Sequence, residues 1–173
     1  MFVKYEEFLV GFDEKLSNYF ERDSKMLKCQ KGCSLCCSNG DYPLSNLEMR
    51  YLMFGFSNLS NEKHELVKAN IQKLCQDDVE QNYVCPFLLN NVCAVYAYRP
   101  LICRIHGLGY MRDNGVVNLP GCAQYGLNYS ENYDGNSVDF EPINEDLSIN
   151  KIVASQMNID FGAVHPLISW FKR

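Results

Sequence analysis

The chain has 173 residues, of which 47% are hydrophobic and 21% charged, and its formal net charge is −5. A chain of this length can bury a stable core, and its 13% aromatic content excludes wholesale disorder. The acidic balance excludes a protein that binds nucleic acid or an anionic membrane through a basic face. We expect a single domain spanning residues 1–173.

The start of the chain does not resemble a secretory signal, because Glu6 and Glu7 interrupt its apolar stretch. No run reaches the roughly 18 apolar residues that a membrane span requires. We therefore expect a cytoplasmic protein with no membrane partner. Its nine cysteines would then stay reduced, and clustered reduced cysteines are more often metal ligands or catalysts than disulfides.

The N-terminal region predicts an amphipathic helix over residues 3–22, because its apolar residues recur every three or four positions. These residues are Tyr5, Phe8, Leu9, Phe12, Leu16, Tyr19 and Phe20. The next stretch, residues 26–41, contains two glycines and four cysteines. We predict a loop there that wraps around a bound group.

Two further helices are predicted before the middle of the chain. Ser45 and Glu48 form a capping-box pattern that introduces a helix over residues 47–54, with Gly55 as its stop. Ser60 is the expected cap of a second helix over residues 61–75. The predicted apolar face of this second helix consists of Leu66, Val67, Ile71, Leu74 and Cys75.

The middle of the chain predicts two short hairpins. Residues 87–96 form the first, with Asn90 and Asn91 in its turn. Residues 109–117 form the second, where Asn114 and Gly115 suit a type I′ turn with positive φ at both positions. Between the hairpins, Pro100 is expected to open a helical turn that carries Cys103.

The last third begins with a polar stretch, residues 128–147, which predicts an extended surface connection. A helical segment follows over residues 148–172, with Ser148 as a cap and Pro166 opening a final turn. The elements together predict a small α+β domain, in which amphipathic helices and short β-hairpins are organised around a cysteine-ligated metal centre.

Eight cysteines form two groups along the chain. They are Cys29, Cys33, Cys36 and Cys37 in the first group, and Cys85, Cys93, Cys103 and Cys122 in the second. Burying a thiolate is unfavourable unless a cation compensates its charge, so the clustering predicts that all eight converge on a metal centre. We expect the side chains of the adjacent pair Cys36 and Cys37 to diverge. Cys75 is predicted to be an ordinary core residue.

The spacing bears on the identity of the metal. Structural zinc usually takes four ligands from two short knuckles, and the second group has no short pair. Iron–sulfur clusters accept three ligands from one loop and a remote fourth, which Cys29, Cys33 and Cys36 with a distant cysteine would supply. The spacing therefore favours a [4Fe–4S] cluster over zinc. A disulfide framework and a set of buried free thiols are the weaker alternatives.

Side chains near the cysteines have structural and functional interpretations. For Arg99 and Arg104 we favour ion pairs that order the loop, the alternative being hydrogen bonds to cluster sulfurs or to an anionic substrate. His106 is expected to be a hydrogen-bonded loop residue, with metal ligation as the alternative. Phe87 and Tyr96 are expected to pack over the site and to exclude water.

The combined motif resembles a known family. It consists of Cys29-Gln-Lys-Gly-Cys33-Ser-Leu-Cys36-Cys37, then Cys85-Pro-Phe-Leu, then Cys93-Ala-Val-Tyr96-Ala-Tyr-Arg99-Pro100-Leu-Ile-Cys103-Arg104. It is similar to the YkgJ-type cysteine-cluster proteins, which implies a zinc- or iron-chelating domain over residues 29–122.

Flagellin lysine-N-methylases carry a similar cysteine arrangement. That resemblance implies an alternative function, an S-adenosylmethionine-dependent enzyme, or an accessory of one, that modifies a protein substrate. The chain has no glycine-rich nucleotide loop after a predicted strand, which counts against this alternative. A zinc-stabilised module that binds a protein partner is a further alternative, so the sequence leaves open whether the protein is an enzyme.

Overall fold

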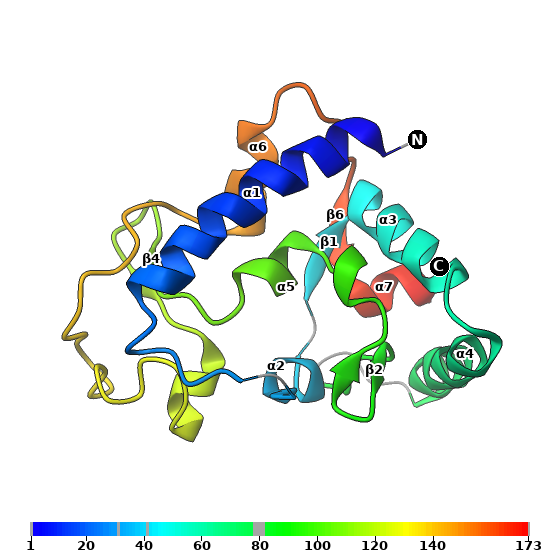
Figure 1. The fold of residues 1–173 in the computed structure, drawn as a ribbon, viewed down its shortest axis with the longest axis horizontal. Helices are drawn as coiled ribbons and strands as arrows, with labels where there is room; N and C mark the ends of the chain where they lie inside the picture. The colour runs from blue at the N-terminus through cyan, green and yellow to red at the C-terminus, as the bar shows by residue number, and fades with distance from the viewer. Residues whose placement is uncertain (1, 31, 41, 78–81, 173) are drawn as a thin grey trace. The chain divides into compact units, whose positions relative to one another are not determined.

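A computed structural model describes residues 2–30, 32–40, 42–77 and 82–172. Over these residues it contains seven α-helices and three two-stranded antiparallel sheets, which confirms the predicted α+β class (Figure 1). The chain forms two compact units. Unit 1 combines Met1–Gln30 with Arg104–Ile159, and unit 2 combines Lys31–Cys103 with Asp160–Arg173.

Unit 1 is built on α1 (Val3–Arg22), the helix that the apolar spacing predicts. Its buried residues are Tyr5, Leu9, Phe12 and Leu16. The other elements of unit 1 are β4 (Tyr110–Met111), β5 (Val117–Asn118), the 3₁₀ helix η2 (Gly121–Tyr125) and α6 (Ile149–Ser155). Helix α6 lies beside α1 (Figure 1), with Phe8, Phe12 and Ile152 lining a shared surface.

The turn between β4 and β5 differs from the predicted type I′ turn. Only Gly115 has positive φ, at 78°, while the amide of Gly115 donates to the carbonyl of Arg112 at 2.9 Å. This geometry fits a type I turn followed by a left-handed glycine, the three-residue hairpin connection. The Asn114–Gly115 pair therefore predicted the hairpin correctly, but the predicted type I′ turn is wrong.

Residues 128–147 form the irregular, largely exposed connection that their polarity predicts, and a few buried residues anchor it. Asn128, Tyr129, Ile143 and Leu147 are buried within this segment. The Tyr129 hydroxyl donates to Asp23 Oδ2 at 2.6 Å, and the amide of Met111 donates to the carbonyl of Ile143 at 2.8 Å. A few apolar and hydrogen-bonding side chains thus anchor a segment whose average composition is polar.

Unit 2 contains the remaining helices and strands. In chain order these are α2 (Leu35–Ser38), β1 (Pro43–Ser45), α3 (Asn46–Ser57), α4 (Asn61–Gln76), β2 (Leu88–Leu89), β3 (Val92–Cys93), η1 (Tyr96–Tyr98), β6 (Val164–Pro166) and α7 (Leu167–Phe171). Helix α5 (Leu101–Ile105) begins in unit 2 and carries Cys103. The predicted helical turn after Pro100 is therefore present.

Strands β1 and β6 pair with Leu44 opposite His165, which joins segments about 120 residues apart in the chain. Nothing in the local sequence pattern predicted this sheet. The unit's core forms around it and consists of Leu44, Met49, Leu52, Phe56, Val67, Phe87, Val95 and Leu167.

Three local predictions need correction. Helix α3 continues through Gly55 to Ser57, and the glycine makes room for the ring of Tyr98, which occupies the space that a side chain at residue 55 would fill. The apolar face of α4 is narrower than predicted, since Leu66 is 49% exposed. The predicted loop over residues 26–41 contains a short helix, α2, within the part that the structure describes.

The predicted helical segment over residues 148–172 is interrupted, because the strand β6 (Val164–Pro166) lies between α6 and α7. The following local predictions in unit 2 are confirmed. Ser45 and Glu48 form the complete capping box at the start of α3. Asn90 and Asn91 both have positive φ, at 50° and 61°, between the paired strands β2 and β3. Among the described residues, no helix combines the length and apolar character needed to cross a bilayer.

Candidate metal centre

Helix α2 presents two adjacent thiols. The Sγ atoms of Cys36 and Cys37 lie 3.9 Å apart, so their side chains converge and the predicted divergence is wrong. The helix holds them through its own turn, in which the amide of Cys37 donates to the carbonyl of Ser34 at 2.9 Å. The next segment is attached directly, because the amide of Cys85 donates to the carbonyl of Cys37 at 2.7 Å.

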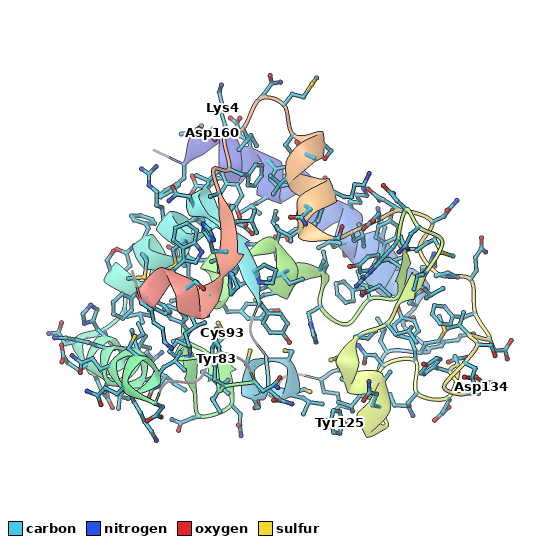
Figure 2. All side chains as sticks on the ribbon, turned by 180° about the vertical axis from the view of Figure 1, so that it is seen from behind. Lys4, Tyr83, Cys93, Tyr125, Asp134 and Asp160 are labelled. Carbon is cyan, nitrogen blue, oxygen red and sulfur yellow. The ribbon has the colours of Figure 1, made fainter. Side chains whose placement is uncertain are left out.

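The β2–β3 hairpin positions Cys85 and Cys93. Cys93 pairs across the hairpin with Leu88, whose amide donates to the carbonyl of Cys85 at 3.0 Å (Cys93 is labelled in Figure 2). The amide of Phe87 donates to the Cys85 sulfur, and the amide of Val95 donates to the Cys93 sulfur. Each bond spans two residues, and such amide–sulfur bonds favour the thiolate over the thiol.

Cys103 comes from α5, and the chain around it is held by a buried carboxylate. Glu48 Oε1 accepts a hydrogen bond from the amide of Leu101 at 2.8 Å. Glu48 is only 1% exposed, and its negative charge acts on the Cys103 thiol. The sequence predicted Glu48 only as a helix cap, because no local pattern indicates a hydrogen bond across 53 residues.

The pKa values of these thiols follow from their surroundings. The hydrogen bond with Cys37 lowers the pKa of Cys36 to about 7 and raises that of Cys37. Burial raises the pKa of Cys85 to about 12 and also raises the pKa of Cys93 and of Cys103. The buried thiols therefore stay protonated at neutral pH unless a cation replaces their protons.

Each of five thiols in unit 2 acts electrostatically on at least one other thiol of the set. They are Cys36, Cys37, Cys85, Cys93 and Cys103. In the part of the chain that is described, no three Cys, His, Asp or Glu side chains are arranged so as to hold a metal ion. The donor set itself suits soft metals, since thiolates select zinc, copper(I) and iron–sulfur clusters. We call these five side chains the thiol cluster.

Four cysteines are not among the five of the thiol cluster. Cys33 is exposed in the loop before α2. Cys29 and Cys122 belong to unit 1, where the amide of Cys29 donates to Asn128 Oδ1 at 3.0 Å and Cys122 is buried in η2. Convergence of all eight predicted ligands stays a prediction. The Cys75 thiol donates to the carbonyl of Phe171 at 3.8 Å, as expected for a residue that packs inside the fold.

Arg104 has the structural role that was favoured, because its side chain is 4% exposed and pairs with Asp13 at 2.5 Å. Arg99 instead stacks on the ring of Tyr96, with 4.0 Å between the guanidinium carbon and the ring centroid. Its positive charge opposes the rise in the pKa of Cys93 that burial causes.

The two aromatic residues expected over the site behave differently. Phe87 is buried in the core of unit 2, whereas Tyr96 is 62% exposed and does not exclude water as predicted. Outside unit 2, burial lowers the pKa of His106, which favours the neutral imidazole.

Fold and thiols together define the class, a small α+β protein with a cysteine cluster suited to a soft metal. The family model CxxCxxCC, described as a "Putative zinc- or iron-chelating domain", matches residues 28–123. Since this match covers more than half of the 173 residues, the chain belongs to that family, and the resemblance seen in the motif is confirmed. Comparisons with curated proteins and with solved structures gave no match.

Proposed function

We propose that the protein binds zinc or iron through the thiol cluster of unit 2. The observation that carries this proposal is that thiols from three chain segments, residues 36–37, 85–93 and 103, act on one another electrostatically, while the amide of Cys85 donates to the carbonyl of Cys37 at 2.7 Å. Buried thiols of raised pKa release their protons when a metal ion supplies the compensating charge. Metal binding would then draw the sulfurs into a closed ligand set and stabilise the fold.

The distance between the adjacent sulfurs favours a single ion. A tetrahedral metal with sulfurs at about 2.3 Å places each pair of sulfurs about 3.8 Å apart. The Sγ atoms of Cys36 and Cys37 are separated by 3.9 Å, so both could ligate one ion without rearrangement of α2.

A [4Fe–4S] cluster is the second candidate, and the number of thiols favours it. The five cluster thiols exceed the four that one tetrahedral ion uses. Cys33, Cys29 and Cys122 would be further ligands if all eight cysteines of the motif serve the centre. A [4Fe–4S] cubane takes one cysteine at each iron. One of Cys36 and Cys37 would then ligate an iron, and the other would lie beside the cluster without ligating it. Either centre requires a reducing compartment such as the cytoplasm.

The test is anaerobic purification followed by elemental analysis and a visible spectrum. Colourless protein with stoichiometric zinc supports the single ion, whereas brown protein absorbing near roughly 400 nm supports the iron–sulfur cluster. Protein that carries neither metal and takes up neither on reconstitution overturns the proposal.

Two serine variants provide a matched comparison. Cys103→Ser replaces a buried thiol of the cluster and should reduce metal content sharply. Cys75→Ser replaces a thiol bonded to the carbonyl of Phe171 and should leave metal content unchanged. Equal metal content in both variants would contradict the assignment of Cys103.

A further inference from the structure

Glu48 is a buried carboxylate that joins two helix starts. Its Oε2 accepts from the amide of Ser45 at 2.7 Å, and its Oε1 accepts from the amide of Leu101 at 2.8 Å. Burial of a carboxylate is unfavourable unless hydrogen bonds compensate it, and both oxygens here are engaged by backbone amides. Glu48 is therefore suited to hold other elements and not to ligate a metal itself.

The bond to Leu101 determines where α5 begins. The first amides of a helix have no acceptor within that helix, and Pro100, which precedes Leu101, has no amide hydrogen at all. The side chain of Glu48 supplies the missing acceptor from α3. Cys103 follows two residues later, so the direction of its thiol depends on this attachment.

A second contact supports the same attachment of α3 to the segment before Cys103. A side chain at Gly55 would lie 2.4 Å from the ring of Tyr98, so this ring lies directly against the backbone of α3. Helix α3 thus contacts the segment before Cys103 at two points, Leu101 through Glu48 and Tyr98 through Gly55.

We propose that Glu48 is a positioning residue for the metal centre, holding Cys103 in place for ligation and adding a negative charge that favours a bound cation. This inference deepens the proposed function and rests on it. Residues that orient metal ligands by hydrogen bonding typically change metal affinity by about 10- to 100-fold when replaced.

The competing interpretation is that Glu48 merely caps α3. Ser45 Oγ accepts from the amide of Glu48 at 3.3 Å, which completes the capping box. Ser45→Ala removes this half of the box and leaves the Leu101 bond intact, so it is the matched control. Glu48→Gln preserves the shape of the side chain and removes its negative charge. It also turns a side-chain NH₂ group toward one of the two backbone N–H donors.

The experiment measures the dissociation constant for Zn²⁺ by competition with a chromophoric chelator, together with the Co²⁺ absorption spectrum. We expect Glu48→Gln to weaken Zn²⁺ binding by about 10- to 100-fold and to alter the Co²⁺ bands. Ser45→Ala should weaken binding by less than about threefold and leave the Co²⁺ bands unchanged. Equal effects in the two variants, or unchanged affinity in Glu48→Gln, would overturn the inference.

A second measurement covers the case in which Glu48→Gln does not fold. In the unaltered protein, the amide of Leu101 should exchange slowly with solvent and should gain at least tenfold further protection when Zn²⁺ is added. Rapid exchange that Zn²⁺ does not slow would also overturn the inference. A protein that binds no metal at all defeats the proposed function instead, so the two failures are distinguishable.

Discussion

Replacing Gly55 by alanine separates helix propensity from tertiary packing. Alanine stabilises an exposed helix interior by roughly 1 kcal/mol relative to glycine. In α3, however, the added carbon would lie 2.4 Å from the Tyr98 ring. That ring cannot easily retreat, because it packs against Tyr51 at 5.1 Å and against Phe54 at 5.8 Å between ring centroids.

The expected net effect is destabilising. Overpacking of this kind lowers the free energy of unfolding by about 1–3 kcal/mol. We expect a value near the upper end of this range, and the gain of roughly 1 kcal/mol in helix propensity offsets only part of it. We expect the free energy of unfolding to fall by about 1–2 kcal/mol, equivalent to roughly 2–8 °C in Tm. Urea unfolding followed by the fluorescence of Trp170 measures this, since the chain's single tryptophan lies in unit 2.

Gly11→Ala is the control for this prediction. Gly11 lies within α1, and a side chain built there has nothing within 4 Å. This substitution should raise stability by about 0.5–1 kcal/mol, measured by circular dichroism. If Gly55→Ala stabilises the protein as much as Gly11→Ala does, the argument from the Tyr98 contact is refuted.

Three further outcomes are expected. In metal-free protein, the free energy of unfolding should decrease above about pH 9. The reason is that Cys85, with a pKa of about 12, keeps its proton in the folded state, while an unfolded thiol loses its proton at about pH 8.5. Each such thiol should lower the free energy of unfolding by about 1.4 kcal/mol per pH unit. Urea unfolding at pH 8, 9 and 10 tests this, and stability that stays constant or rises would contradict it. Tyr129→Phe removes a 2.6 Å hydrogen bond to the buried Asp23. The free energy of unfolding, measured in urea, should fall by about 1.5–3 kcal/mol, and a loss below about 0.5 kcal/mol would show that the bond is unimportant. If the protein only chelates metal, calorimetric titration of metal-loaded protein with S-adenosylmethionine should give no saturable heat, and saturable heat would favour the enzyme instead.

Local chemistry made much of this fold predictable. The three- and four-residue spacing gave α1 with its observed bounds, and the Ser45–Glu48 pair gave the start of α3. Asn90 and Asn91 indicated the turn of the β2–β3 hairpin. These features depend on neighbours in the chain, which is why the sequence pattern reveals them.

The features that the sequence did not reveal are long-range. The pairing of Leu44 with His165 and the bond between Glu48 and Leu101 join residues far apart in the chain. Gly55 was predicted to end α3, whereas it lies inside the helix and makes room for Tyr98, a residue 43 positions later. At the candidate site, the cysteines were identified by type and spacing, while the grouping of five of them in unit 2 required the three-dimensional structure.

The discontinuity of unit 2 has a consequence for its biosynthesis. Strand β6 and helix α7 complete this unit, yet they are translated after the whole of residues 104–159. A nascent chain therefore exposes its cysteine-rich first part to the cell well before the final strand emerges from the ribosome. Loading of the centre is accordingly expected only after β6 and α7 have been translated, and premature termination near residue 160 would leave an open, oxidation-prone set of sulfhydryls.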